Sequence, residues 1–256
     1  MKRILSLCSF LFLIHTHTTY ATDFSTQIFG GTNVAPSDAV AKSTIGIVGT
    51  IPGQGNYICT GTLVDKDIVL TAAHCVLDER RRPIAQLKIL YGTNMAQPVT
   101  QSPVTSSQAH QQYRPVAVDD NDIALLYFKG GLPQGYKIAQ LPPATFALAA
   151  GQKLAVAGYG INAPKSSPFG SQGSGTLRAT YDKVQAPNYG RTEFSIAPDR
   201  NTGDCFGDSG GPFYVQNQGN LAVVGVVSRG ITADCRDGGV HTRVAAHIAW
   251  INQTAN

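Results

Sequence analysis

Gly207-Asp208-Ser209-Gly210-Gly211-Pro212 places one serine among three glycines. Small neighbours let the backbone turn tightly and leave the hydroxyl and the nearby N–H groups open to a ligand. A serine hydroxyl is a poor nucleophile unless a neighbouring base takes its proton. The segment therefore predicts a nucleophilic serine and requires a base elsewhere in the chain.

His74 is the histidine best placed to be that base. It follows Leu70-Thr71-Ala72-Ala73, an apolar strand end with small residues, and precedes Cys75. A general base has to be held at a fixed position, and a disulfide at Cys75 would provide this. Without Ser209, a structural imidazole in the core would be the preferred interpretation of His74.

Asp122 completes the candidate set because it opens the apolar segment Asp122-Ile123-Ala124-Leu125-Leu126. An unpaired charge in such surroundings is costly, so we expect a partner for its carboxylate, and a histidine N–H is suitable. The neighbouring Asp119 and Asp120 fit exposed turn acids better.

The order histidine, aspartate, serine separates this chain from other hydrolase folds with the same chemistry. The α/β-hydrolase order would need Asp234 or Asp237 followed by His241, and the subtilisin order would need Asp65 or Asp67 before His74. Both folds need alternating strands and helices, and this sequence lacks the helices.

Composition and periodicity favour an all-β protein. Hydrophobic residues make up 43% and charged residues 14%, which excludes a disordered chain and a membrane bundle. Short apolar or β-branched runs, separated by Gly, Pro, Asn or Asp, predict strands in a sandwich or barrel. The clearest runs are residues 44–50, 87–91, 123–128, 153–157 and 221–227. The single predicted helix spans residues 243–252.

The first 21 residues are interpreted as a signal peptide. Lys2 and Arg3 precede an apolar run at residues 4–14, and small residues at Thr19 and Ala21 suit signal peptidase. The run is shorter than the roughly 20 residues that cross a bilayer. We therefore expect a protein secreted outside the cell, with the periplasm as the alternative.

Export makes disulfides the expected state of the cysteines that remain after Cys8 is removed. Four cysteines allow three pairings, and the shortest loops join neighbours along the chain. Such closures contribute roughly 3 to 4 kcal/mol each. The favoured pairs are Cys59 with Cys75 and Cys205 with Cys235.

Three segments together resemble the trypsin/chymotrypsin-type serine proteases: Thr71 to Cys75, Asp122 to Leu126 and Gly207 to Pro212. Weaker agreement comes from Val227 to Gly230, Gly239 to Val244 and Trp250-Ile251. The resemblance implies two six-stranded antiparallel β-barrels with the site in the cleft between them. The expected barrels span roughly residues 28–140 and 141–242 of a protease domain at 28–256.

The resemblance also implies residue roles. Ser209 would attack the scissile carbonyl, His74 would take and return the proton, and Asp122 would orient the imidazole. The backbone N–H groups of Gly207 and Ser209 would hold the oxyanion. Ser228 would support Asp122, and the segment Ser228-Arg229-Gly230 would pair with the substrate backbone.

Activation is expected to depend on Ile28 and Asp208. Ile28-Phe29-Gly30-Gly31 resembles the mature terminus of the family, whose new ammonium group would pair with Asp208. Two departures stand out: Phe29 replaces the usual Val, and Gln27 precedes the cut where trypsin-like cleavage needs Arg or Lys. Residues 22–27 would then be a propeptide that another protease removes.

Specificity is expected to come from a pocket built by Gly203, Asp204, Gly230 and Gly239. Gly203 stands where trypsin has its pocket acid, and Asp204 is one step away. An open pocket with one acid predicts a preference for Lys or Arg before the cut. The alternative is broad or apolar specificity. Arg229, where Trp is common, is expected to oppose cationic substrates.

The remaining expectations concern partners. Protein substrates and protein protease inhibitors are the expected partners of a monomeric enzyme that needs no cofactor and no metal. Nucleic acid is excluded because the net charge of +4 is weak and Arg80-Arg81-Arg82 lacks aromatic neighbours. No membrane contact is expected after the signal is removed. The alternative from another class is an inactive protease-like binding module, which loss of a triad residue would favour, and none is lost.

Overall fold

A computed structural model describes residues 27–51, 53, 55–78, 80–115, 117–162, 173–199 and 201–255 of this chain. The predicted signal peptide at 1–21 and residues 22–26 of the predicted propeptide lie outside the described residues. No helix in these described ranges has the length and apolarity needed to cross a membrane.

The first half of the chain forms a closed antiparallel barrel with strand order β2-β3-β4-β7-β6-β5. Its strands are β2 (Thr44–Ile51), β3 (Gly55–Leu63), β4 (Ile68–Thr71), β5 (Lys88–Tyr91), β6 (Thr100–Ala109) and β7 (Ala124–Phe128). Apolar and β-branched side chains fill its interior because alternate residues of each strand face inward. Ile45, Ile47, Leu63, Val69 and Ile89 are all fully buried there.

The second half forms a second barrel. Its strands are β8 (Lys153–Gly158), β9 (Arg178–Ala186), β10 (Glu193–Ile196), β11 (Pro212–Asn217), β12 (Asn220–Gly230) and β13 (Gly239–Arg243). Neighbours follow the order β9-β10-β13-β12-β11-β8, and an additional β8–β9 pairing closes the ring. The predicted fold of two six-stranded antiparallel barrels is therefore confirmed.

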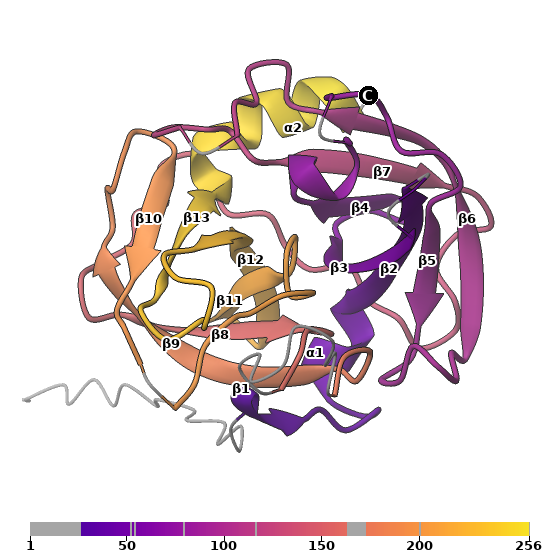
Figure 1. The fold of residues 1–256 in the computed structure, drawn as a ribbon, viewed down its shortest axis with the longest axis horizontal. Helices are drawn as coiled ribbons and strands as arrows, with labels where there is room; N and C mark the ends of the chain where they lie inside the picture. Colours follow the sequence, from indigo (N-terminus) through magenta and orange to yellow (C-terminus); the bar gives the residue numbers. More distant parts are fainter. Residues whose placement is uncertain are drawn as a thin grey trace, which may run out of the picture.

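The barrels lie side by side, and the chain crosses between them several times (Figure 1). A further strand, β1 (Gln27–Asn33), pairs with β9 of the second barrel, and the short helix α1 (Ala39–Ser43) leads from it into β2. Because each end of the chain reaches both barrels, the two halves are tied together at the level of the backbone.

The chain ends in helical structure, as the sequence predicts for residues 243–252. A 3-10 turn, η2 (Val244–His247), comes first, and α2 (Ile248–Ala255) follows. The Tyr127 hydroxyl donates a hydrogen bond to the carbonyl of Thr254 at 2.6 Å. The helix that follows the second barrel is thus fastened to β7 of the first.

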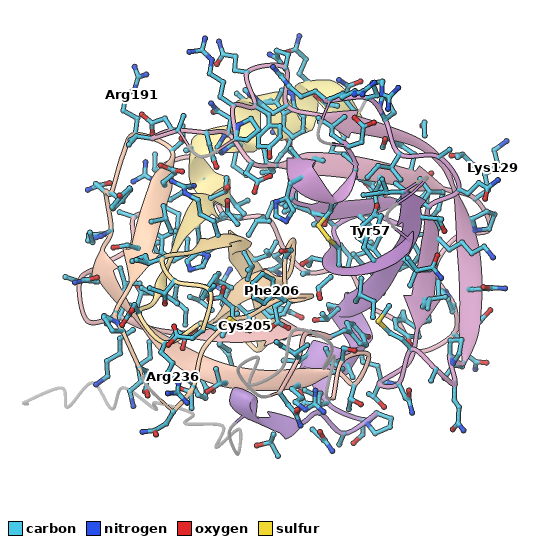
Figure 2. The ribbon with its side chains drawn as sticks, viewed as in Figure 1. Tyr57, Lys129, Arg191, Cys205, Phe206 and Arg236 are labelled. Atoms are coloured by element: carbon cyan, nitrogen blue, oxygen red, sulfur yellow. A yellow bond between two sulfur atoms is a disulfide. The ribbon has the colours of Figure 1, made fainter. Side chains whose placement is uncertain are left out.

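Two disulfides are present, Cys59–Cys75 and Cys205–Cys235. They are the pairs favoured for their short loops, so this prediction is confirmed. The first joins β3 to the 3-10 turn η1 (Ala73–Cys75), and the second joins the loops before β11 and β13. Figure 2 shows Cys205 and its neighbour Phe206 near the middle of the view, in the loop before β11.

Candidate active site

His74 sits on η1, the tight turn that begins two residues after the buried strand β4. The strand is buried throughout and apolar except for Thr71, and the small residues Ala72 and Ala73 allow the chain to turn within the core. The disulfide at Cys75 ties the turn to β3. The imidazole is therefore carried by a turn that is covalently anchored to β3, and its side chain is 32% exposed.

Asp122 lies against His74, just before β7. Its Oδ2 atom is 2.7 Å from His74 Nδ1, and its Oδ1 accepts the His74 backbone N–H at 3.0 Å. The Ser228 hydroxyl, from β12, also donates to Oδ2, at 2.7 Å. Asp122 is only 2% exposed. A buried carboxylate with this many donors is stabilised in its charged form.

The charges of this pair support each other. Burial raises the pKa of Asp122, but the charge of His74 and the hydrogen bonds from His74 and Ser228 together lower it by more. The pKa of Asp122 therefore lies below its ordinary value. Burial lowers the pKa of His74, but the charge and hydrogen bond of Asp122 raise it more. The imidazole is thus a stronger base than a free histidine, with Nε2 left to serve a nucleophile.

Ser209 is held at the junction of the two barrels. Its carbonyl accepts the N–H of Thr60 in β3 at 2.8 Å and lies 3.5 Å from Cys75 Sγ. The next residue, Gly210, donates its N–H to Val227 of β12 at 2.8 Å. The structure thus brings the serine turn next to the turn that carries His74.

Gly210 shows why this segment needs glycine. Its φ is +79°, and a Cβ built there would lie 2.0 Å from Thr71 Oγ1 and 2.5 Å from the carbonyl oxygen of Thr60. A side chain at this position would force Thr71 and the backbone of Thr60 to shift. The approach of the serine turn to the first barrel therefore depends on the absence of a Cβ at residue 210.

Asp208 is fully buried beside the serine. Its two carboxylate oxygens accept the N–H groups of Gly160 and Cys205 at 2.8 and 2.9 Å. Burial raises its pKa to about 8, and these hydrogen bonds lower it only partly. In the described ranges no cation forms an ion pair with Asp208. The backbone of Ile28 lies in β1, whose first residue, Gln27, pairs with Ala179 of β9.

Three of the predicted specificity residues, Asp204, Gly230 and Gly239, lie around the start of β13. Gly230 and Gly239 are paired residues of β12 and β13. Asp204 is 8% exposed, and burial raises its pKa to about 7. Its Oδ1 lies 3.5 Å from Nε2 of His241. His241 was not predicted as a site residue, although it stands two residues after Gly239 in β13 and so faces the same side.

Arg229 does not present a free charge to the cleft. Its Nη1 donates to Asp120 at 2.8 Å and to Glu193 at 2.7 Å. Both acids are almost completely buried, at 2% and 0% exposure. The expectation that Arg229 opposes cationic substrates is therefore not supported, because two carboxylates compensate its charge.

The same contacts correct the prediction for the acidic loop. Asp120 is buried, and Asp119 is half-buried, with its Oδ1 accepting both the N–H and the hydroxyl of Thr192. The interpretation of both as exposed turn acids is wrong. For Asp120 the available signal was Arg229: an arginine in a predicted strand needs an acidic partner, and that partner comes from a distant segment.

Cys59, His74 and Cys75 are the one set of potential metal ligands that lie close together in the part of the chain that the structure describes. Both cysteines are oxidised to a disulfide, and a metal needs a thiolate. This set therefore does not fit a metal ion.

Comparison with known proteins gives consistent matches. The family model described as Trypsin matches residues 29–251. Granzyme M of Homo sapiens is 28% identical over 247 residues, which cover 91% of this chain and 90% of the relative. Trypsin Tyr p 3.0101 of Tyrophagus putrescentiae is 28% identical over 252 residues, covering 89% and 80%. A solved structure named "Structure of GrC" superposes with a TM-score of 0.72 at 28% identity, over 89% of this chain and 99% of the other.

Proposed function

This chain belongs to the trypsin family of serine endopeptidases, and from that premise we propose that it is an exported endopeptidase whose nucleophile, base and orienting acid are Ser209, His74 and Asp122. The observation that carries the proposal is the hydrogen-bonded series from Ser228 through Asp122 to His74. It fixes one ring nitrogen and leaves the other for a proton from the serine.

The reaction follows the mechanism of the family. The Ser209 hydroxyl oxygen bonds to the scissile carbonyl carbon while its proton passes to His74 Nε2. The resulting oxyanion accepts the N–H groups of Gly207 and Ser209, and one such donor is typically worth about 3 to 4 kcal/mol. His74 then gives the proton to the leaving amine, which departs as the acyl-enzyme forms. A water molecule then attacks the acyl-enzyme carbonyl while His74 takes its proton. The carboxylic acid product leaves as His74 returns the proton to Ser209.

Labelling with a fluorophosphonate tests this role of Ser209. The reagent phosphonylates a serine only when a neighbouring base and oxyanion site activate it. We expect one label per activated chain, lost in Ser209→Ala and strongly reduced in His74→Ala. Correctly folded protein that neither takes up the label nor cuts denatured protein substrates would instead support the inactive binding module.

For the substrate, the proposal is cleavage after Lys or Arg. The support is a buried acid, Asp204, whose neighbour His241 lies against Gly239, together with the compensation of Arg229 by Asp120 and Glu193. Initial rates on matched ester substrates with Arg, Lys, Phe or Leu before the cut test this. A preference of about tenfold or more for Phe over Arg would favour the apolar alternative.

Maturation is proposed to occur in two cuts. The signal peptide at 1–21 is removed on export, and cleavage after Gln27 then frees the ammonium group of Ile28 to pair with Asp208. The fully buried carboxylate of Asp208, with two N–H donors and a pKa raised to about 8, supports this because a cation would complete its environment. The mature domain would be residues 28–256, acting as a monomer on protein substrates and open to protein inhibitors.

N-terminal sequencing of secreted material, combined with a comparison of two engineered chains, tests this maturation. A chain that begins at Ile28 is expected to be active, and a chain with one Met before Ile28 is expected to be inactive. Equal turnover by both would remove the role of the ammonium group.

A further inference from the structure

His241 is a buried histidine that the proposed mechanism does not use. It lies in β13, is 0% exposed, and packs against Phe213 and Phe194, with ring centroids 4.6 and 5.5 Å away. A Cβ added at Gly239 would lie 2.5 Å from its Nε2 atom. The imidazole therefore lies directly against one of the glycines proposed to keep the specificity pocket open.

The hydrogen bonds of His241 define its tautomer. The backbone N–H of Ser228 approaches Nδ1 at 3.4 Å, so Nδ1 acts as an acceptor. A neutral ring that accepts at Nδ1 carries its hydrogen on Nε2. Nε2 is buried, has no hydrogen-bond partner in the described residues, and lies 3.5 Å from Asp204 Oδ1. The N–H of Nε2 is therefore unpartnered, and the Asp204 carboxylate lies at the outer limit of hydrogen-bond distance from it.

The other charged groups around this pair are mostly acidic. Asp182, on the inward face of β9, is 5% exposed and has an oxygen, Oδ2, without a partner among the described residues. Burial raises its pKa well above the ordinary value, and Asp204, Asp199 and Asp208 raise it further.

The cations near the pair are engaged elsewhere. Arg229 lowers the pKa of His241 but pairs with Asp120 and Glu193. Arg178, near Asp208, donates to the backbone carbonyls of Gly160, Gly173 and Thr176. In the described chain, the surroundings of Asp204 and His241 therefore hold carboxylates, while these two arginines are paired elsewhere.

We infer that His241 is a specificity-determining residue whose unpartnered Nε2–H donates a hydrogen bond to Asp204 once that carboxyl is charged, and that selection of Lys or Arg is switched on when Asp204 loses its proton. The inference rests on the proposed peptidase function and deepens it. A neutral Asp204 would leave the pocket without charge and open to apolar side chains, whereas a charged Asp204 would favour an ammonium or guanidinium group. One enzyme would thus have two specificities, selected by pH.

The direction of the switch follows from the pKa values. Burial raises the pKa of Asp204 to about 7, so the carboxyl is neutral below that pH and charged above it. Burial, with a smaller effect from Arg229, lowers the pKa of His241 to about 3, so this ring stays neutral throughout. Preference for cations should therefore rise with pH through neutrality.

The test compares two peptide substrates that differ only in Arg or its uncharged isostere citrulline before the cut. The ratio of their kcat/KM values cancels the titration of His74, which affects both equally. Since kcat/KM reports the free enzyme, the ratio should rise roughly 30-fold from about pH 5.5 to about pH 8.5. A ratio that does not change across this range in the wild-type enzyme overturns the inference.

Three variants make the test specific. Asp204→Asn should give a low ratio at every pH. His241→Phe, compatible in shape with its aromatic neighbours, should shift the midpoint of the rise to higher pH because the charged carboxylate loses its donor. Asp237→Asn removes an exposed acid close by in the chain and should leave the midpoint unchanged. Equal midpoints in His241→Phe and wild type would exclude the role of His241.

A binding measurement separates this inference from the proposed function. Calorimetry of benzamidine, an aromatic amidinium, with the activated Ser209→Ala protein needs no turnover. Affinity about tenfold or more higher at about pH 8.5 than at about pH 5.5 supports the switch even if no peptide is cut. Equal affinity at both pH values contradicts it even if the enzyme is an active peptidase.

Discussion

The residues that hold Asp122 in place come from different parts of the chain. Asp122 accepts hydrogen bonds from the backbone and ring of His74 and from the hydroxyl of Ser228, while Thr242 donates to its carbonyl at 2.9 Å. A carboxylate with so many donors has little freedom to rotate. The imidazole is therefore oriented by a group that is itself fixed from both barrels.

We predict that Ser228→Ala weakens catalysis without weakening binding. A hydrogen bond to a charged group contributes about 1.5 to 3 kcal/mol, so kcat should fall on the order of tenfold or more while KM stays nearly constant. Steady-state kinetics on one peptide substrate measure this. Ser106→Ala, at an exposed position in β6, is the control that should match wild type. An unchanged kcat in Ser228→Ala would show that His74 alone suffices to orient Asp122.

Arg229 offers a second prediction at this scale. Replacement by Met keeps much of its length but leaves Asp120 and Glu193 buried without a cation. Breaking a buried ion pair by removing one partner typically costs 3 to 5 kcal/mol, so we expect a loss of about that size in unfolding free energy. Urea titration measures it. The triple variant Arg229→Met, Asp120→Asn, Glu193→Gln should recover most of the lost unfolding free energy. If it does not, the loss comes from altered packing around residue 229 and not from unpaired charges.

At the scale of elements, the serine turn depends on the space between two strands. Gly210→Ala should destabilise the protein by about 2 kcal/mol or more, because the new Cβ would contact Thr71 and Thr60 at a positive φ. Gly219→Ala is the matched control, since Gly219 has a φ of +81° and no atom within 4 Å of its Cβ position. The difference between the two variants in thermal unfolding isolates the contact from the backbone strain. Similar losses in both would mean that the contact is relieved by a small shift.

Sequence patterns predicted the elements whose side chains alternate clearly or form an apolar run. Residues 44–50 and 153–157 lie within β2 and β8, for example. β6 was missed because its ten residues are largely exposed and rich in Ser, Thr and Gln, so no apolar pattern marks it. β10 was missed because its buried face includes Glu193, whose burial depends on a distant arginine.

The site was predictable to a similar extent. His74, Asp122 and Ser209 each stand in a recognisable segment, and the structure brings the first two into direct contact. The spacing of His241 from Gly239 places both on one face of β13, but the contact of His241 with Asp204 and the burial of Asp182 could not be predicted, since a strand residue has no local mark that shows what lies across the barrel. Contacts between strands that are distant in sequence decide their surroundings.

At the scale of the whole molecule, the junction between the barrels carries the site. Thr60 of β3 donates its hydroxyl to the carbonyl of Gly207 at 3.0 Å and accepts the N–H of Tyr159 at 3.1 Å. Tyr159 in turn donates through its own hydroxyl to the carbonyl of Gly92 at 2.7 Å. A relative shift of the barrels would therefore disturb the placement of Gly207, next to the serine turn, relative to the first barrel.

The uncut and the cut chain should differ in how pH affects their stability. Burial raises the pKa of Asp208 to about 8 from an ordinary value of 3.8. A raised pKa means that the folded uncut chain holds a proton that the unfolded chain has lost, so its stability decreases as the pH rises from about 4 to about 8. In the cut chain, an ion pair with Ile28 would lower this pKa and remove the decrease.

Thermal unfolding of the inactive Ser209→Ala protein, uncut and beginning at Ile28, measures this difference. We expect the melting temperature of the uncut form to fall by about 4 °C or more relative to the cut form between these pH values. Asp208→Asn in the uncut chain should abolish the fall. Parallel curves for both forms would show that the ammonium group does not reach Asp208.

The pairing of β1 with β9 affects how the proposed cleavage after Gln27 could take place. Proteases bind their substrates as extended strands, and the bond after Gln27 is already part of a strand that β9 holds. A protease that cut this bond would therefore compete with β9 for the backbone of β1. If cleavage after Gln27 matures the chain as proposed, opening of this sheet edge would limit the rate of conversion, and a partner that loosened the edge would accelerate it without cutting any bond.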